Sequence, residues 1–290
     1  MGGTVERLFG GSNGGDALAQ GKVNVAVETL ILTRNGNVIV ARSGPNTTTI
    51  ERSRQQNIEF DLAVASPDLW SVASPTLYDL VVRIEKDGQL VDAFTTPIGF
   101  RNVNITSTDR GRRLSVNDSI VAIHAVDYVE DYPHRGASMS WRQMEQDVSL
   151  MKTLGVNVVR THNGSPHPYF LALCDRYGIM VMAEIPAADI PSDMIRLEEI
   201  LARYRNASER TIAYLDSHPS VIALGLSDGL EEGSEDVAAY HADLVKLYRR
   251  VSSKMLYKVI SAGLVGSTSE GGFDLVVVSF SSTQDRQRFD

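Results

Sequence analysis

The sequence of 290 residues is poor in the residue types that several specialised kinds of structure need. Cys174 is the only cysteine, so the chain cannot form an internal disulfide or a cluster of thiolate metal ligands. The longest apolar runs, 179–183 and 275–278, are far too short to span a lipid bilayer. The six histidines show no HExxH or other metal-ligand spacing, so the sequence gives no reason to assign a metal site.

Basic side chains are also in the minority. Lys and Arg total 28 against 36 Asp and Glu, which gives a net charge of −8 without any basic cluster. Such a chain has little to attract phosphate backbones or anionic lipid, so we expect neither nucleic acid nor a membrane as partner. Hydrophobic residues make up 43% and charged residues 22%, which is the usual balance of a soluble globular protein.

The first 21 residues are rich in glycine and show no periodicity, which predicts a flexible leader. They lack the basic and then apolar layout of a signal peptide. This leaves the compartment open between a bacterial cytoplasm and a periplasm.

Residues 22–105 read as short alternating segments separated by turn signals, among them Asp87-Gly88 between two such segments. No helical pattern interrupts them. Alternation over about 85 residues is typical of a small antiparallel β-sandwich.

From residue 112 to 290, apolar β-like runs alternate with amphipathic helices. The first helix is expected to begin at Ser140, with Gln143 completing a capping box, and to end at Gly155. Its spacing places Trp141, Met144, Val148, Met151 and Leu154 on one buried face, and Trp70 is expected in the core as well. Further helices are expected over 168–177, 192–215 and 235–253, between strands at 120–126, 157–162, 179–185, 221–226, 258–262 and 275–280.

Apolar strands alternating with helices indicate a parallel sheet covered by helices. No glycine-rich phosphate loop follows the first strand, which counts against a nucleotide-binding sheet. Polar residues follow nearly every strand, as at the mouth of a TIM-type barrel. They include His124, Asp127, Arg160, His162, Asn163, Glu184 and Asp228.

Five blocks of the sequence resemble glycoside hydrolase family 2, the family of bacterial β-galactosidases and β-glucuronidases. The stretch 68–105, with its LWS, LY and closing GFR, resembles the end of the family's immunoglobulin-like domain. The blocks 114–133, 147–163, 170–186 and 218–229 are similar to the first four barrel strands with their loops, in order and at matching spacing. The resemblance implies an immunoglobulin-like sandwich followed by a TIM-type barrel that runs only to its sixth strand.

The resemblance also implies a retaining glycosidase chemistry that needs two carboxyl groups and no cofactor. In register from His218-Pro219, however, the family's general acid/base Glu falls on Gly229 and the Asn before it on Asp228. The family's nucleophile belongs to a seventh strand. Asp228, or Glu231 after a loop shift, is the substitute carboxyl that remains, and the alternative is a solvated acidic loop.

Other strand-end residues are candidates for sugar contacts. The resemblance places Asp127, His162 and Asn163 at the barrel mouth, where the family contacts its sugar. Glu184 reads either as an acceptor for sugar hydroxyls or as the partner of Arg160, which itself reads as a buried structural member of the polar floor.

Two functions stay open at this point. One is hydrolysis of O-glycosyl bonds of β-linked sugars as the ancestral activity, lost in this chain; the other is a non-catalytic saccharide-binding or interaction module. A six-stranded parallel sheet would also leave apolar edges at strands 120–126 and 275–280, which predicts self-association.

Overall fold

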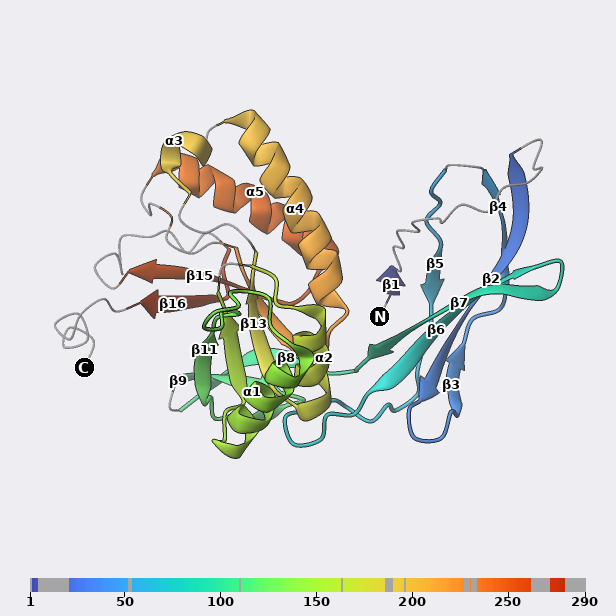
Figure 1. The fold of residues 1–290 in the computed structure, drawn as a ribbon, viewed down its shortest axis with the longest axis horizontal. Helices are drawn as coiled ribbons and strands as arrows, with labels where there is room; N and C mark the ends of the chain where they lie inside the picture. The colour runs from blue at the N-terminus through green and yellow to red at the C-terminus, as the bar shows by residue number, and fades with distance from the viewer. Residues whose placement is uncertain are drawn as a thin grey trace. The chain divides into compact units, whose positions relative to one another are not determined.

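The computed structural model describes residues 2–4, 21–51, 54–109, 111–162, 164–185, 190–195, 197–226, 230, 234–261 and 272–279. The chain divides into two compact units (Figure 1). The first comprises Met1–Asp68 and Thr76–Phe100, and the second comprises Leu69–Pro75 and Arg101–Asp290. The short segment Leu69–Pro75 therefore belongs with the second unit although it lies within the stretch predicted as sandwich.

The first unit is antiparallel β-structure, as its alternating sequence predicts. Its larger sheet has the order β3-β2-β6-β7, with β4 also paired to β2, and a second sheet pairs β1 with β5. The strands are β1 (Gly2–Thr4), β2 (Lys22–Thr33), β3 (Ile39–Arg42), β4 (Asn46–Glu51), β5 (Glu59–Asp61), β6 (Tyr78–Lys86) and β7 (Gln89–Ile98). Valines of β2 and β6 form its small buried cluster.

The hairpin predicted at Asp87-Gly88 is confirmed. These two residues join β6 to β7, with φ angles of 50° and 77°. Two successive positive φ angles are what a two-residue type I′ turn requires, and its twist matches that of the flanking strands.

The second unit begins with a small antiparallel sheet that the sequence did not predict. It consists of β8 (Val103–Thr108), β9 (Gly111–Val116) and β10 (Ser119–Ile120), in the order β10-β9-β8. The strand expected over 120–126 is therefore wrong in its bounds, because Ile120 closes this sheet and the parallel strand β11 spans Ala125–Tyr128.

The main sheet has six parallel strands in sequential order, β11-β12-β13-β14-β15-β16, which confirms the TIM-barrel type predicted for this half. After β11 come β12 (Val158–Thr161), β13 (Met180–Glu184), β14 (Val221–Gly225), β15 (Met255–Ser261) and β16 (Leu275–Ser279). Strands β13 and β14 are almost wholly buried, which explains their continuous apolar sequence.

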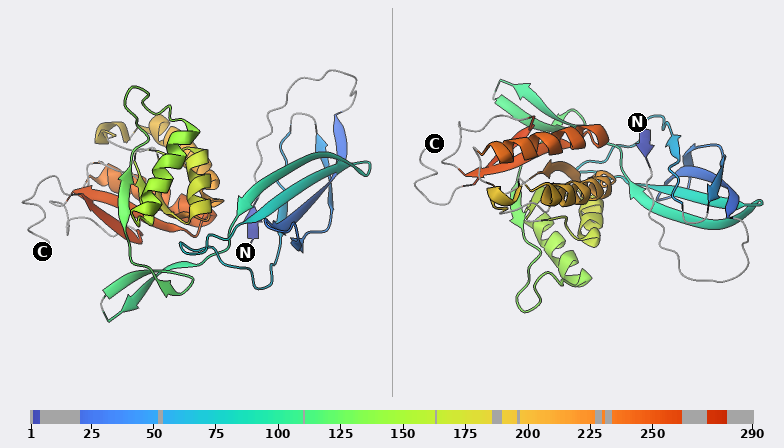
Figure 2. Two further views of the ribbon diagram at one scale, coloured as in Figure 1. Left: turned by 60° about the horizontal axis from the view of Figure 1, so that its bottom comes forward. Right: turned by 90° about the horizontal axis from the view of Figure 1, so that it is seen from above.

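Helices α1 (Trp141–Thr153) and α2 (Pro168–Tyr177) pack against each other beside this sheet, as do α4 (Glu198–Asp216) and α5 (Glu235–Val251) (Figure 2). The expected single helix over 192–215 is instead split into α3 (Ser192–Ile195) and α4, because Leu197 adopts an extended conformation. None of the described helices combines the length and the apolar character that crossing a membrane would require.

The N-terminal cap predicted for α1 is confirmed, but the burial predicted for Trp141 and Leu154 is wrong. The Ser140 hydroxyl accepts a hydrogen bond from the backbone N–H of Gln143, and Met144, Val148 and Met151 are buried. Trp141 and Leu154, however, are 67% and 70% exposed. They sit at the first turn and just past the last, where the helix extends beyond the core that its middle residues contact.

Trp70 is fully buried, as expected, and it anchors the segment Leu69–Pro75 in the second unit. Its indole N–H donates to the backbone carbonyl of Asp175 at 2.8 Å. Beside it, Gly178 ends α2 with a φ of 67°, and a Cβ at this position would lie 2.5 Å from the carbonyl oxygen of Val72. Glycine is thus required twice at Gly178, by its left-handed backbone and by the close approach of this segment.

Candidate functional site

Four of the predicted site residues come together at the carboxyl ends of the first three parallel strands. Asp127 on β11 lies directly opposite Arg160 on β12, and Arg160 lies opposite Met182 on β13. Glu184 is two residues beyond Met182, so its side chain projects from the same face of β13. His162 follows the end of β12. Parallel pairing thus gathers these residues at one edge of the sheet.

Arg160 is the centre of this cluster. Its Nε and Nη2 donate to the two carboxylate oxygens of Asp127 at 2.8 and 3.1 Å. Its Nη1 donates to Oε1 of Glu184 at 3.4 Å. Its Nη2 also lies 2.5 Å from Nε2 of His162, which is itself 3.2 Å from Asp127. The prediction of a buried, acid-paired Arg160 is confirmed, but Asp127 rather than Glu184 is its closer partner.

The cluster favours the ionised form of Asp127. The hydrogen bond from Arg160 outweighs burial, and with a further contribution from His162 it holds the pKa of Asp127 below its usual value. Burial alone would lower the pKa of Arg160, but Asp127 and then Glu184 raise it above its ordinary value. The cation is therefore permanent, and the ionised Asp127 pairs with it.

Burial differs sharply between the two carboxylates. The Glu184 side chain is 2% exposed, whereas that of Asp127 is 59% exposed. His162 is intermediate. Asp127, held by two hydrogen bonds from Arg160, is thus the part of the cluster that a molecule arriving from solvent contacts first.

Tyr257 on β15 completes the cluster from the other side, a residue that the sequence did not single out. Its hydroxyl lies 3.3 Å from Oε1 of Glu184 and 3.3 Å from the carbonyl oxygen of Met182, so it reaches across β14. Gly225 lies between Glu184 and Tyr257 in the strand register, and a Cβ there would lie 2.6 Å from the Tyr257 ring. The missing side chain of Gly225 opens the path for the tyrosine.

The sequence carries only an indirect signal for Tyr257. The strand predicted over 258–262 begins one residue after Tyr257, whereas β15 spans Met255–Ser261, and the role of Tyr257 depends on the register across three strands. Glycine at 225 in an otherwise apolar strand is the one hint, since an isolated glycine there often marks a close approach of other atoms.

The other candidates from the sequence are Asn163, Asp228, Glu231 and His124. Asn163, Asp228 and Glu231 fall outside the described residues. His124 precedes β11 and is exposed, with its ring Nδ1 3.2 Å from the carbonyl oxygen of Gly155. Within the described part of the chain, no group of three or more His, Cys, Asp or Glu is arranged to hold a metal ion.

The chemistry available at the cluster is recognition of a polar, hydroxyl-bearing molecule. Asp127 can accept hydrogen bonds from hydroxyl groups, and a fixed ionised acceptor makes stronger bonds than a neutral one. An acid catalyst, in contrast, must hold a proton near neutral pH. The hydrogen bond from Arg160 lowers the pKa of Asp127, which opposes its protonation.

Two models of known families match the chain. The model "Glycosyl hydrolases family 2, TIM barrel domain" matches residues 108–262, more than half of the chain. The model "Glycosyl hydrolases family 2" matches residues 16–101. The order of the two matches is that of the two units described above.

Known proteins are similar to the chain in sequence and in fold. A β-galactosidase from Psychromonas ingrahamii is 32% identical over 183 residues, which are 59% of this chain and 17% of that protein. A family 2 glycosyl hydrolase from Bacteroides cellulosilyticus has a similar fold, with a TM-score of 0.77, 21% identity, and coverage of 92% of this chain and 35% of the other. A β-galacturonidase from Eisenbergiella tayi, solved with galacturonate, gives a TM-score of 0.71 at 21% identity, covering 83% and 42%. The chain thus spans about a sixth of the length of the curated relative.

Proposed function

Because this chain belongs to glycosyl hydrolase family 2, we propose that the carboxyl ends of its parallel strands form a saccharide site that binds sugar without hydrolysing it. Asp127 and His162 would contact the sugar, and Asn163 is a third candidate contact that the sequence alone suggests. Arg160 and Glu184 would form the rigid floor beneath, and Glu184 is also a candidate acceptor for a sugar hydroxyl.

The observation that carries this proposal is the double engagement of Arg160 by Asp127 and Glu184. A sugar ring presents several hydroxyl donors, and it is bound best by acceptors that do not move when it arrives. The Asp127 carboxylate has this property, because two nitrogens of one buried guanidinium hold both of its oxygens.

Hydrolysis of O-glycosyl bonds is the ancestral activity that the family resemblance suggests. A retaining mechanism needs two carboxyl groups about 5 Å apart, one protonated and one ionised. Alignment on His218-Pro219 puts glycine where the family has its acid, so Asp228 or Glu231 would have to replace it. We propose that neither does so within residues 1–290.

Two measurements test this function. Residues 1–290 should not hydrolyse aryl β-galactosides or aryl β-glucuronides above background, because general acid–base catalysis alone contributes about 10²–10⁴-fold. Turnover that Asp228→Asn or Glu231→Gln abolishes would overturn the non-catalytic assignment and would identify the substitute acid.

Binding is tested with galactose and galacturonate followed by NMR at millimolar concentration. Asp127→Asn should weaken binding about tenfold or more, because hydrogen bonds to charged groups contribute about 1.5–3 kcal/mol. Asp118→Asn, in the exposed turn between β9 and β10, is the matched control and should bind as the parent chain does. Equal affinity of the Asp127→Asn and Asp118→Asn variants would remove the strand-end site.

A further inference from the structure

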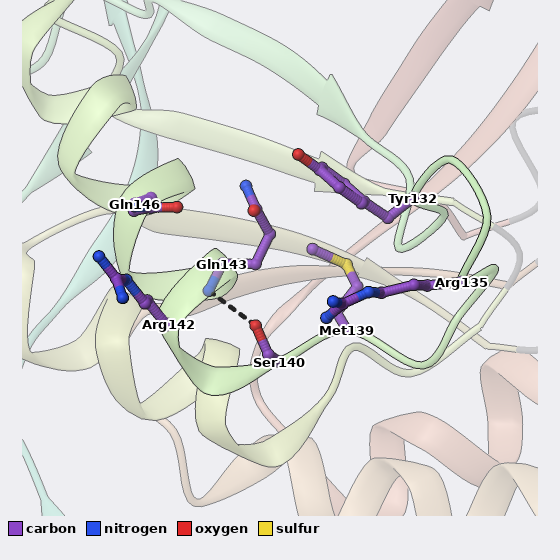
Figure 3. Close-up of a pocket in the computed structure, with 7 residues that line it drawn as sticks. All are labelled: Tyr132, Arg135, Met139, Ser140, Arg142, Gln143 and Gln146. Carbon is purple, nitrogen blue, oxygen red and sulfur yellow. Dashed lines mark hydrogen bonds between the residues drawn. The ribbon is translucent and has the colours of Figure 1, made fainter.

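A surface pocket of about 300 Å³ lies between the loop that follows β11 and the first turns of α1 (Figure 3). It shares no residue with the strand-end cluster. Its lining residues are Tyr132, Arg135, Met139, Ser140, Arg142, Gln143 and Gln146.

Two positive charges line this pocket, in a chain whose net charge is −8. Among the described residues, neither Arg135 nor Arg142 forms an ion pair or a side-chain hydrogen bond. The carboxylate nearest to Arg142 in the chain, Glu145, accepts a hydrogen bond from the Tyr169 hydroxyl, and Asp147 accepts from Nε2 of Gln143 at 2.8 Å and from the Tyr128 hydroxyl at 3.0 Å. Asp131, four residues before Arg135, forms no ion pair with that arginine in the described part of the chain. The two guanidinium groups are thus available to a ligand.

The other lining groups are polar but uncharged, apart from one apolar side chain. Tyr132 and Ser140 carry hydroxyls, and Gln143 and Gln146 carry amides that can both donate and accept. The Ser140 hydroxyl accepts from the backbone N–H of Gln143 and caps α1. Met139 supplies an apolar surface, and its sulfur is held by the Tyr128 hydroxyl at 3.7 Å.

The loop side of the pocket is held by a tight turn. Tyr132 and Gly136 exchange two backbone hydrogen bonds, of 3.1 and 2.9 Å, and form an isolated antiparallel bridge. His134 and Gly136 have φ angles of 67° and 55°, which close this turn. The backbone that carries Tyr132 and Arg135 is therefore fixed before any ligand arrives, and this reduces the entropy lost on binding.

We propose that this pocket binds a small polyhydroxylated anion, of the class of sugar phosphates and sugar acids. Its volume is at the lower end of small-molecule sites and suits one sugar-sized ring. Guanidinium groups bind phosphate and carboxylate oxygens through paired N–H donors, and the neutral donors and acceptors around them suit hydroxyl groups. The site goes beyond the proposed saccharide function, because it uses other residues and requires a negative charge on the ligand.

The test uses the whole chain, isotopically labelled, with the side-chain amides of Gln143 and Gln146 as NMR reporters. The probes are glucose 6-phosphate, glucuronate and uncharged glucose. Glucose 6-phosphate or glucuronate should shift both reporters in a saturable way, and whichever binds more tightly identifies phosphate or carboxylate as the preferred group. Glucose should bind these residues at least tenfold more weakly.

Variants connect the binding to the two arginines. Arg135→Gln and Arg142→Gln should each weaken the anion at least fivefold, whereas Arg112→Gln, an exposed arginine on β9, should change it less than twofold. Asp127→Asn should leave this binding unchanged, which separates it from the strand-end site. Equal loss in the Arg112→Gln variant, equal binding of glucose, or no binding of either anion would overturn the proposal, and thermal unfolding curves verify that each variant is folded.

Discussion

At the scale of single residues, the strand-end cluster depends on the balance of charge around Arg160. Two carboxylates share one buried guanidinium, and only one of them is exposed to water. Removing the cation therefore affects the two acids unequally. Asp127 can be hydrated, but Glu184, which is 2% exposed, would lose the guanidinium that pairs with it.

Arg160→Met is therefore expected to lower the free energy of unfolding by about 3 kcal/mol, the usual cost of breaking a buried ion pair. Urea unfolding measures this change, and Arg112→Met on an exposed strand serves as control. Replacing Glu184 by leucine as well should recover part of the loss, since no buried charge then remains. A double variant less stable than Arg160→Met alone would contradict this account.

The stability effects of substitutions at Gly225 and Tyr257 should also depend on each other, here because of a steric contact rather than a charge. Gly225→Ala places a methyl group against the Tyr257 ring and should destabilise the fold by about 2 kcal/mol. In a Tyr257→Leu background the same change should cost much less. A double-mutant cycle by urea unfolding gives the coupling energy. Gly44→Ala, where no heavy atom lies within 4 Å, is the matched control, and additive effects at 225 and 257 would refute the contact.

Some of the cluster could be predicted from the sequence because local rules determine it. A guanidinium that follows two buried valines needs a carboxylate partner, so the pairing of Arg160 was foreseeable. Which acid lies closer depends on the register of β11 against β12, which no local pattern encodes. The exposure of Trp141 was missed for a related reason: helical spacing identifies a face but not where along the helix the core stops.

At the scale of elements, the sequence predicted the structure best where a backbone conformation admits few residue types. Gly178 ends α2 and Asp87-Gly88 joins β6 to β7, because few residues adopt positive φ angles. The prediction of a single strand from Ile120 to Val126 was wrong because its apolar residues belong to two sheets, one antiparallel and one parallel. The split between α3 and α4 was missed because amphipathic periodicity continues across it.

One contact between elements predicts a pH dependence of stability. His241 on α5 is buried, and burial, with a further contribution from Lys258 on β15, lowers its pKa to about 4. The unfolded chain takes up this proton near pH 6.5, so stability falls as the pH drops from about 6.5 to about 4.

When the pH is lowered from 7 to 5, His241 should reduce the free energy of unfolding by about 2 kcal/mol. His241→Gln should reduce the loss by that amount in urea unfolding at the two pH values. The exposed His124→Gln should keep the parent's pH dependence. If both variants behave alike, His241 is not the group responsible.

At the scale of the whole molecule, the two edges of the parallel sheet stand out. In the described part of the chain, β11 and β16 each have one neighbour, and Val126 and Val276 on them are partly exposed. β16 is apolar along most of its length, whereas β11 also carries Asp127. Unpaired strand edges of this kind attract further strands. The sequence indicated this, because LVVVSF carries neither proline nor charge.

We therefore expect residues 1–290 to self-associate through these edges, which sedimentation equilibrium measures directly. Val276→Lys should shift the chain toward monomer, because a charge on an edge strand opposes pairing. Val251→Lys, at the exposed end of α5, should not do so. A parent chain that stays monomeric at high concentration would show that the edges are otherwise protected.

The burial of Trp70 determines how this protein can be dissected. The chain leaves the first unit at Asp68, contributes Leu69–Pro75 to the second, and returns at Thr76. No single cut therefore separates the two units cleanly. A recombinant fragment starting at Arg101 would lack the indole that donates to the Asp175 carbonyl, and the complementary fragment would carry a large apolar side chain without its binding site. Peptide 69–75, added in trans or fused to the fragment that starts at Arg101, should restore the missing contact. A unit boundary placed by sequence order alone would therefore remove part of the core of the second unit.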